Sequence, residues 1–394
     1  MVDKFSAVAA GHICLDVIPN MDNLPVGQFA SLFQPGQLLS IGPVTFSTGG
    51  PVSNTGLALF RLGVPTRLVA KVGADPFGQV VCHLVESVNA ELVQGLVVDT
   101  HAVTSYSVIV SPPGIDRIFL HCSGANDTFG PEDIDFDLAA GAGLFHFGYP
   151  PIMRRMYAQG GEELAEVFRR ARASGSTTSL DMAFPDPSSP GGQVDWRAIL
   201  TRALPFVDIF MPSIEELLFM IERETYDRLP VGGLLAAVQP ELLSRLAKAL
   251  IELGVKIVVF KLGDRGLYLR TAGRSALAEM GRAAPADLAV WADQELWAPC
   301  FQVKVVGTTG SGDATIAGFL SALLRDCPPR QAITMAVAVG ACNVEAADAL
   351  SGLRSWDETL ARVRQGWARL PLALSAPGWC WSESDQLWVG PAGD

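Results

Sequence analysis

A glycine-rich segment at residues 307–314 (Gly-Thr-Thr-Gly-Ser-Gly-Asp-Ala) is the part of the chain best suited to chemistry. Apolar residues at helical spacing follow it, which predicts a loop that opens a buried helix; they are Ile316, Phe319, Leu320, Leu323 and Leu324. The first turn of a helix has N–H groups without intrahelical partners and the positive end of the helix dipole, and glycines let a phosphate approach them closely. The segment therefore predicts an anion-binding loop.

Asp313 lies within this loop, where a carboxylate would repel a bound phosphate. The acid is useful if a substrate hydroxyl must lose its proton beside the phosphate, as in phosphoryl transfer. The alternative is an ordinary acidic residue in the first turn of a helix, where it favours the dipole without any catalytic role. Phosphoryl transfer is the first hypothesis.

A second glycine-to-helix junction lies near the N-terminus, in residues 47–63. Gly49 and Gly50 are followed by Asn54 and by an amphipathic pattern that ends at Gly63. Glycine lets a ligand lie close to the backbone, and an amide side chain can pair with hydroxyl groups. Asn54 could equally be a simple helix-start residue.

Other nucleotide-binding signatures are absent from the sequence. It contains no Gly-x-x-x-x-Gly-Lys-Ser/Thr loop, no Gly-x-Gly-x-x-Gly fingerprint and no protein-kinase His-Arg-Asp and Asp-Phe-Gly set. The late glycine loop is therefore the best candidate for a phosphate site.

Short apolar strands alternate with helical patterns along the chain, which predicts a mostly parallel sheet covered on both faces. The expected strands are residues 5–11, 176–181, 206–211 and 256–260, and the expected helices include 162–172 and 242–253. Residues 222–240 and 271–295 look like insertions. Asp16 lies just beyond the first strand, where open α/β sheets bind ligands, although an exposed loop acid is the alternative.

Composition limits the classes of function. A net charge of −12 argues against a nucleic-acid partner. No signal peptide and no run of about 20 apolar residues is visible, so we expect a soluble, cytoplasmic protein without a membrane partner. The seven cysteines are scattered without metal-binding spacing, and the five histidines lack a His-Glu-x-x-His pattern, so both sets are expected to be structural.

Together, the two glycine junctions resemble the paired signatures of the ribokinase-like (PfkB) carbohydrate kinase family. Further matches to the family lie in order along the chain, and the resemblance covers roughly residues 5 to 355. These matches are Gly11 with Asp16, residues 72–78, Leu180 with Asp181, residues 212–216 and residues 261–266.

The resemblance implies an α/β fold, a ribokinase-like three-layer α/β/α sandwich with a mostly parallel central sheet. It also implies a small β-sheet lid, built from segments at about 17–48 and 102–122, through which a homodimer could form. A kinase domain would then occupy residues 1–378. Residues 379–394 would be a C-terminal extension rich in tryptophan, which we expect to dock onto the body because free tails are usually polar.

The family's functional residues can be carried over position by position. Asp313 would be the base, with an anion hole formed by the backbone N–H groups of Gly310, Ser311 and Gly312 through to Asp313 itself. The residues implied to hold the sugar are Asp16, Gly49, Gly50 and Asn54. Those implied to flank ATP are Lys261, Gly263, Gly266 and Asn343. Glu216 would handle magnesium and phosphate, although Ser213 stands where the family has asparagine.

The implied function is ATP-dependent, Mg²⁺-requiring phosphorylation of a hydroxymethyl group on a small sugar. A nucleoside kinase of the same fold is one alternative. A non-catalytic ligand-binding protein is another, because Gly307 and Ser213 depart from the family pattern. Polar lid residues favour a sugar, whereas aromatic lid residues could hold a nucleobase. The polar set is Asn20, Asp22 and Asn23, and the aromatic set is Phe29, Phe33, Phe46 and Tyr106.

Overall fold

The computed structural model describes residues 3–25, 34–114, 117–229 and 233–391. Eleven of its strands form one sheet in the order β14-β15-β13-β12-β11-β10-β9-β8-β1-β4-β5. The strands from β11 to β5 are parallel to one another, and those from β12 to β14 are antiparallel. The expected three-layer sandwich with a mostly parallel sheet is confirmed.

The strands of this sheet have the following bounds: β1 Asp3–Gly11, β4 Thr66–Gly73, β5 Leu96–Asp99, β8 Ala142–Gly148, β9 Thr177–Asp181, β10 Ile209–Phe210, β11 Ile257–Lys261, β12 Leu267–Thr271, β13 Glu295–Ala298, β14 Cys380–Ser382 and β15 Leu387–Val389. The strand expected at 206–211 is shorter than predicted: Phe206 belongs to a 3₁₀ turn, Leu204–Phe206, formed around Pro205, and the strand spans Ile209–Phe210. Proline lacks the N–H that a central strand needs.

Two apolar layers form on the faces of the sheet because successive strand residues point to opposite sides. Val8, Phe145 and Val258 pack on one face, against a helical layer. Their neighbours Ala7, Leu144 and Ile257 pack on the other. The first layer is built from α4 Phe136–Gly141, α5 Arg154–Tyr157, α6 Glu162–Ala173, α8 Trp196–Ala203, α9 Ile214–Ile221 and α12 Pro240–Glu252. The second includes α2 Pro51–Arg61, α15 Ser311–Leu324, α16 Pro329–Asn343 and α17 Trp356–Arg364.

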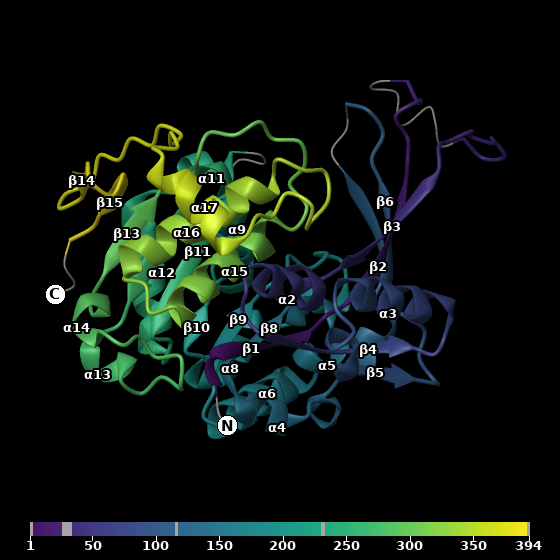
Figure 1. The fold of residues 1–394 in the computed structure, drawn as a ribbon, viewed down its shortest axis with the longest axis horizontal. Helices are drawn as coiled ribbons and strands as arrows, with labels where there is room; N and C mark the ends of the chain where they lie inside the picture. Colours follow the sequence, from purple (N-terminus) through teal and green to yellow (C-terminus); the bar gives the residue numbers. More distant parts are fainter. Residues whose placement is uncertain (1–2, 26–33, 115–116, 230–232, 392–394) are drawn as a thin grey trace.

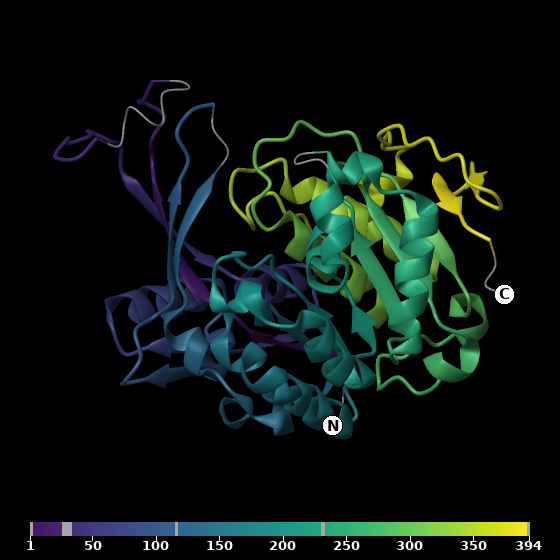
Figure 2. The same ribbon diagram turned by 180° about the vertical axis from the view of Figure 1, so that it is seen from behind.

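A second, four-stranded sheet forms the lid and projects from the body in both views (Figures 1 and 2). Its order is β3-β2-β6-β7, with bounds β2 Cys14–Pro19, β3 Val44–Gly49, β6 Tyr106–Val110 and β7 Ile118–Cys122. Two antiparallel pairs are joined by the parallel pair β2 and β6. Helix α3, Pro76–Val88, packs at the base of this sheet. The predicted lid is therefore confirmed, and it is continuous with the end of β1.

The C-terminal segment lies at the end of the molecule opposite the lid (Figure 1). Strand β15 pairs with β13, and Trp379 packs between Tyr268 and Trp297. The expected docking of the tail is thus confirmed. The division of the chain at residue 378 stays a prediction. Strands β14 and β15, which lie beyond that residue, continue the central sheet.

The segments expected to be insertions fold into short helices, α10 Arg223–Arg228 and α11 Leu234–Ala237 in the first, α13 Arg274–Leu277 and α14 Leu288–Trp291 in the second. No helix in the described part of the chain has both the length and the apolar character needed to cross a bilayer.

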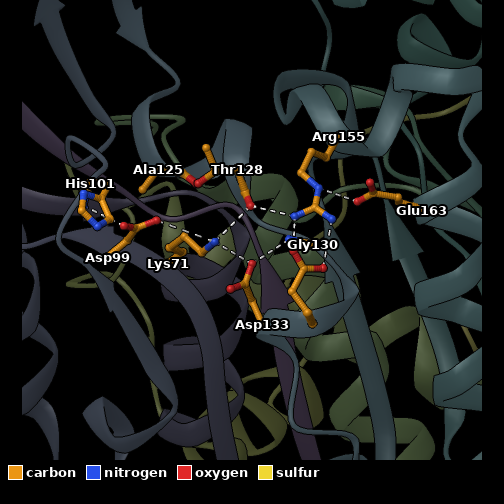
Figure 3. A network of polar contacts seen from close by, with 10 residues as sticks. Lys71, Asp99, His101, Ala125, Thr128, Gly130, Asp133, Arg155 and Glu163 are labelled. Carbon is orange, nitrogen blue, oxygen red and sulfur yellow. Dashed lines mark hydrogen bonds and ion pairs between the residues drawn. The ribbon is translucent and has the colours of Figure 1, made fainter.

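An ion-pair network, buried at Lys71 and more exposed at Arg155, anchors the segment that leads from the lid back into the body (Figure 3). Lys71 Nζ lies 2.7 Å from Asp133 and donates to the Thr128 carbonyl at 3.0 Å. Arg155 pairs with Glu132 and, at 2.6 Å, with Glu163. The segment at 124–133 is therefore held from two sides.

Candidate active site

The carboxyl ends of four parallel strands, β1, β8, β9 and β11, lie along one edge of the sheet, with β10 between β9 and β11. Gly11 of β1 is paired with Gly148 of β8, which is paired with Asp181 of β9, and β11 ends at Lys261. Open α/β sheets bind ligands at this edge. The strand order therefore brings residues from distant parts of the sequence to one place.

Helix α15 begins at the same edge, where the glycine loop was predicted to bind an anion. Gly310 caps the helix with φ 69°, a left-handed conformation that favours glycine. Gly312 is partly exposed in the first turn, where helical N–H groups point outward. The Ser311 N–H donates to the Thr308 carbonyl at 3.2 Å, so it would have to be released or shared to join an anion hole.

The Asp313 carboxylate is buried in that first turn and accepts hydrogen bonds from three side chains. Asn54 Nδ2 donates at 3.0 Å and Thr55 Oγ1 at 3.2 Å, both from α2. The Tyr149 hydroxyl lies 3.0 and 3.2 Å from the two carboxylate oxygens. Burial raises the pKa of Asp313, while Asn54, Lys261 and the two hydroxyls oppose the rise.

Three hydrogen-bond donors fix the orientation of this carboxylate. The sequence identified Asn54 and missed both Thr55 and Tyr149. Thr55 follows Asn54 directly, and Tyr149 comes directly after the buried strand β8, before two prolines. A polar residue just beyond a buried strand was the available signal, since ligands bind at strand carboxyl ends.

The residues predicted to hold a sugar adjoin Asp313 through Asn54, whose N–H donates to the Gly50 carbonyl. A Cβ at Gly49 would come within 2.5 Å of Asp16 Oδ2, so a side chain at 49 would displace that carboxylate. Gly50 has φ 87°, and a Cβ there would lie 2.5 Å from His12 Nδ1. The structure therefore brings Asp16, both glycines and Asn54 together.

Asp16 is 8% exposed, and burial raises its pKa to about 6. Hydrogen bonds with Cys14 and Ser107 partly oppose that rise. A carboxylate in this setting can accept hydrogen bonds from substrate hydroxyls at neutral pH and loses that capacity in mild acid.

Lys261 places a largely buried positive charge beside the start of α15. Its Nζ lies 2.6 Å from Asp181 Oδ1, and a Cβ at Gly312 would be 3.7 Å from the same Nζ. Burial alone would lower the pKa of Lys261, but the carboxylates of Asp181, Glu216 and Asp313 raise it. The positive charge of Lys261 and the positive end of the α15 dipole therefore lie side by side, and both favour binding of an anion at the start of this helix.

Glu216 lies near this cation and is also part of a capping box at the start of α9. Its carboxylate accepts the Ser213 N–H at 2.7 Å, and Ser213 Oγ accepts the Glu216 N–H at 3.2 Å. Ser213, which departs from the family pattern, thus serves as a helix cap. Magnesium handling by Glu216 stays a prediction.

Gly263, Gly266 and Asn343 have structural contacts. Gly266 has φ 93°, and a Cβ there would lie 2.0 Å from the Ala298 carbonyl oxygen. Asn343 is fully buried and donates to the Ala349 carbonyl at 2.6 Å. Ala349 in turn lies against Gly310, so Asn343 supports the loop that packs on the helix start. Contact of these three residues with a nucleotide stays a prediction, and for Asn343 it would require this loop to move.

The lid reaches the glycine loop directly. Arg117, which precedes β7, donates to Thr308 Oγ1 at 2.5 Å. The polar lid residues form hydrogen bonds within the lid: Asn20 Nδ2 donates to the Asp22 carboxylate, and Asn23 Nδ2 donates to the Ser40 carbonyl. Tyr106 packs edge-on against Phe77, while Phe29 and Phe33 lie outside the described residues.

Comparison with known proteins matches residues 4–356 to the model of the pfkB family carbohydrate kinases. An ATP-dependent ribose-1-phosphate kinase of Halopiger xanaduensis is 26% identical, over 85% of this chain and 90% of its own length. The structure of an Arabidopsis thaliana ribokinase complexed with ribose and ATP covers 92% of this chain and 98% of its own, with TM-score 0.67 and 18% identity. An E. coli putative ribokinase II in complex with ATP and Mg²⁺ covers 91% and 99%, with TM-score 0.65 and 19% identity.

Proposed function

This chain belongs to the pfkB family of carbohydrate kinases, and from that membership we propose that it transfers the γ-phosphoryl group of ATP to a hydroxymethyl group of a small sugar. One observation carries the proposal. The buried Asp313 carboxylate, held by Asn54, Thr55 and Tyr149, is linked through Asn54 to the glycines beside Asp16 and interacts with the Lys261 cation. This is the arrangement that an acceptor, a base and a phosphate site require.

In the proposed reaction, Asp16 and Asn54 bind sugar hydroxyls, and Gly49 and Gly50 let the sugar lie against the backbone. Asp313 accepts the proton of the attacking hydroxyl and orients that oxygen. In a loose phosphoryl-transfer transition state charge gathers on the phosphate oxygens, where fixed N–H dipoles and a cation stabilise it. We assign that task to the Gly312 N–H and to Lys261, whose Nζ would lie 3.7 Å from a Cβ at Gly312.

The residues present fit a phosphate donor and a metal ion. Asp181 Oδ2 is buried and has no hydrogen-bond partner among the described residues. The carboxylates of Asp181 and Glu216 both raise the pKa of Lys261, so both lie near that cation. These two carboxylates would hold Mg²⁺ directly or through water. When bound, the ion neutralises charge on the phosphate oxygens. The Arg117 contact with Thr308 supports a lid that covers this site.

The test is ATP turnover with a panel of pentoses, hexoses, sugar acids and nucleosides. We expect turnover with at least one sugar. Efficient phosphorylation of adenosine, inosine or cytidine, with no sugar accepted, would make the protein a nucleoside kinase. A rise in melting temperature with a ligand but no ATP consumption would indicate a binding protein instead.

A further inference from the structure

Two histidines and a cysteine gather where the lid joins the body. His12 follows the end of β1, Cys14 begins β2, and His121 lies in β7 of the lid. One potential ligand atom from each lies within 4.8 Å of the others. The two Nε2 atoms are 3.3 Å apart.

This spacing suits a bound metal ion as well as it suits a hydrogen bond between the rings. With metal–nitrogen distances of about 2.0–2.1 Å, two imidazoles on a tetrahedral ion have nitrogens about 3.3 Å apart. Imidazole and thiolate ligands select zinc and similar transition metals, whereas magnesium prefers oxygen.

The surroundings orient these side chains as they do in metal sites. His121 Nδ1 lies 3.0 Å from Ser107 Oγ, a contact that fixes the ring and directs Nε2 toward His12. Asn126 bonds both the N–H and the carbonyl of Ile13, at 3.2 and 2.8 Å, which locks the backbone between the two other ligands.

We propose that His12, Cys14 and His121 form a binding site for a divalent transition-metal ion of the zinc class at the junction of lid and body. The Asp16 carboxylate borders the site, with Oδ1 3.5 Å from Cys14 Sγ. An ion there links β7 of the lid to the end of β1. The site is separate from the magnesium site proposed at Asp181 and Glu216, and it does not depend on the proposed reaction.

The experiment is calorimetric titration of the full chain with ZnCl₂, after dialysis against a chelator under reducing conditions. We expect one tight site per chain. His121→Asn should weaken binding by more than about 100-fold, and Ser107→Ala, which removes an outer contact, by about 10–100-fold. Replacement of zinc by Co²⁺ should give the visible bands of a tetrahedral ion and a near-ultraviolet sulfur-to-cobalt band that Cys14→Ala abolishes.

Two matched variants control for adventitious binding, because His83 and Cys380 are exposed and lie outside the cluster. His83→Asn and Cys380→Ser should leave the tight site unchanged, and circular dichroism should show that every variant is folded. The proposal is overturned if zinc does not bind near one equivalent, or if a folded His121→Asn variant binds it as tightly as the parent chain does. It is equally overturned if either control variant abolishes the site.

Discussion

The Tyr149 hydroxyl contacts both carboxylate oxygens of Asp313, at 3.0 and 3.2 Å, across 164 residues of sequence. Tyr149 has φ 66° and lies immediately after β8, so its backbone turns sharply at the edge of the sheet. A non-glycine residue in this conformation is held by its surroundings, and such residues concentrate at functional sites. The tyrosine is therefore a positioning residue for the proposed base.

Replacing Tyr149 by phenylalanine should raise the pKa of Asp313, because the hydroxyl stabilises the ionised carboxylate that burial disfavours. Activity needs the ionised form, so the acidic limb of the kcat/KM profile should move to higher pH. The profile measured between pH 5 and 9 tests this. Tyr157→Phe, whose ring packs against Trp196 away from Asp313, is the control and should keep the parent profile. An unchanged limb in Tyr149→Phe would show that the hydroxyl does not tune the base.

Asp313→Asn should lower turnover by about 10² or more while leaving folding and ATP binding nearly intact, since general bases contribute about 10²–10⁴-fold. Turnover, ATP affinity and melting temperature are the three measurements. Asp227→Asn, which changes an exposed partner of Arg223, controls for the loss of a negative charge. Near-normal turnover in folded Asp313→Asn would remove Asp313 from the role of base.

The two glycine junctions could be located from sequence because each contains glycines followed by a helical apolar pattern. Asp313 and Asn54 lie within a few residues of those glycines, so the two motifs locate these side chains as well. Tyr149 could not be placed on Asp313 in this way, because their contact depends on the order of parallel strands. The His12, Cys14 and His121 cluster was missed for the same reason, since the lid brings residue 121 back beside residue 12.

Asn343 shows a different limit of sequence-based prediction. Its position in a late helix was compatible with either a nucleotide contact or a buried amide. The choice between these two roles depends on the loop that follows the helix, because the Asn343 side chain donates a hydrogen bond to the Ala349 carbonyl in that loop. No periodic pattern encodes a contact of that kind.

Asp16 should make sugar affinity depend on pH. Its pKa is raised to about 6 by burial, so the carboxylate becomes protonated as pH falls through 6 and loses acceptor capacity. KM for the sugar should therefore rise below pH 6, and Asp16→Asn should abolish this rise. Asp16→Ala should weaken sugar binding by roughly 1–3 kcal/mol at neutral pH, because hydroxyls in the site lose a partner. A sugar KM that is flat between pH 5 and 8 in the parent chain would contradict the role of Asp16.

Potassium should activate the protein only weakly. Gly307 departs from the pattern of the family that the sequence resembles, in which an aspartate at this position would help to hold a monovalent cation, and glycine offers no side-chain oxygen. The backbone leaves no space for one either, since a Cβ at Gly307 would lie 2.8 and 2.9 Å from the Ala347 and Ala346 carbonyl oxygens. Rates in potassium and in a bulky organic cation at equal ionic strength test this. A large increase with potassium would mean that those carbonyls supply the missing ligands.

The lid should pair with the lid of a second copy of the chain. Strand β7 is an edge strand of the lid sheet, with Phe119 52% and Leu120 58% exposed. Apolar side chains on an open edge favour association through strand and side-chain contacts. We therefore expect a homodimer in sedimentation equilibrium at micromolar concentration, and a monomer for Leu120→Glu. Val290→Glu, a matched change at an exposed valine of α14, should remain dimeric. A parent chain that stays monomeric at these concentrations would show that the exposed lid residues serve another contact.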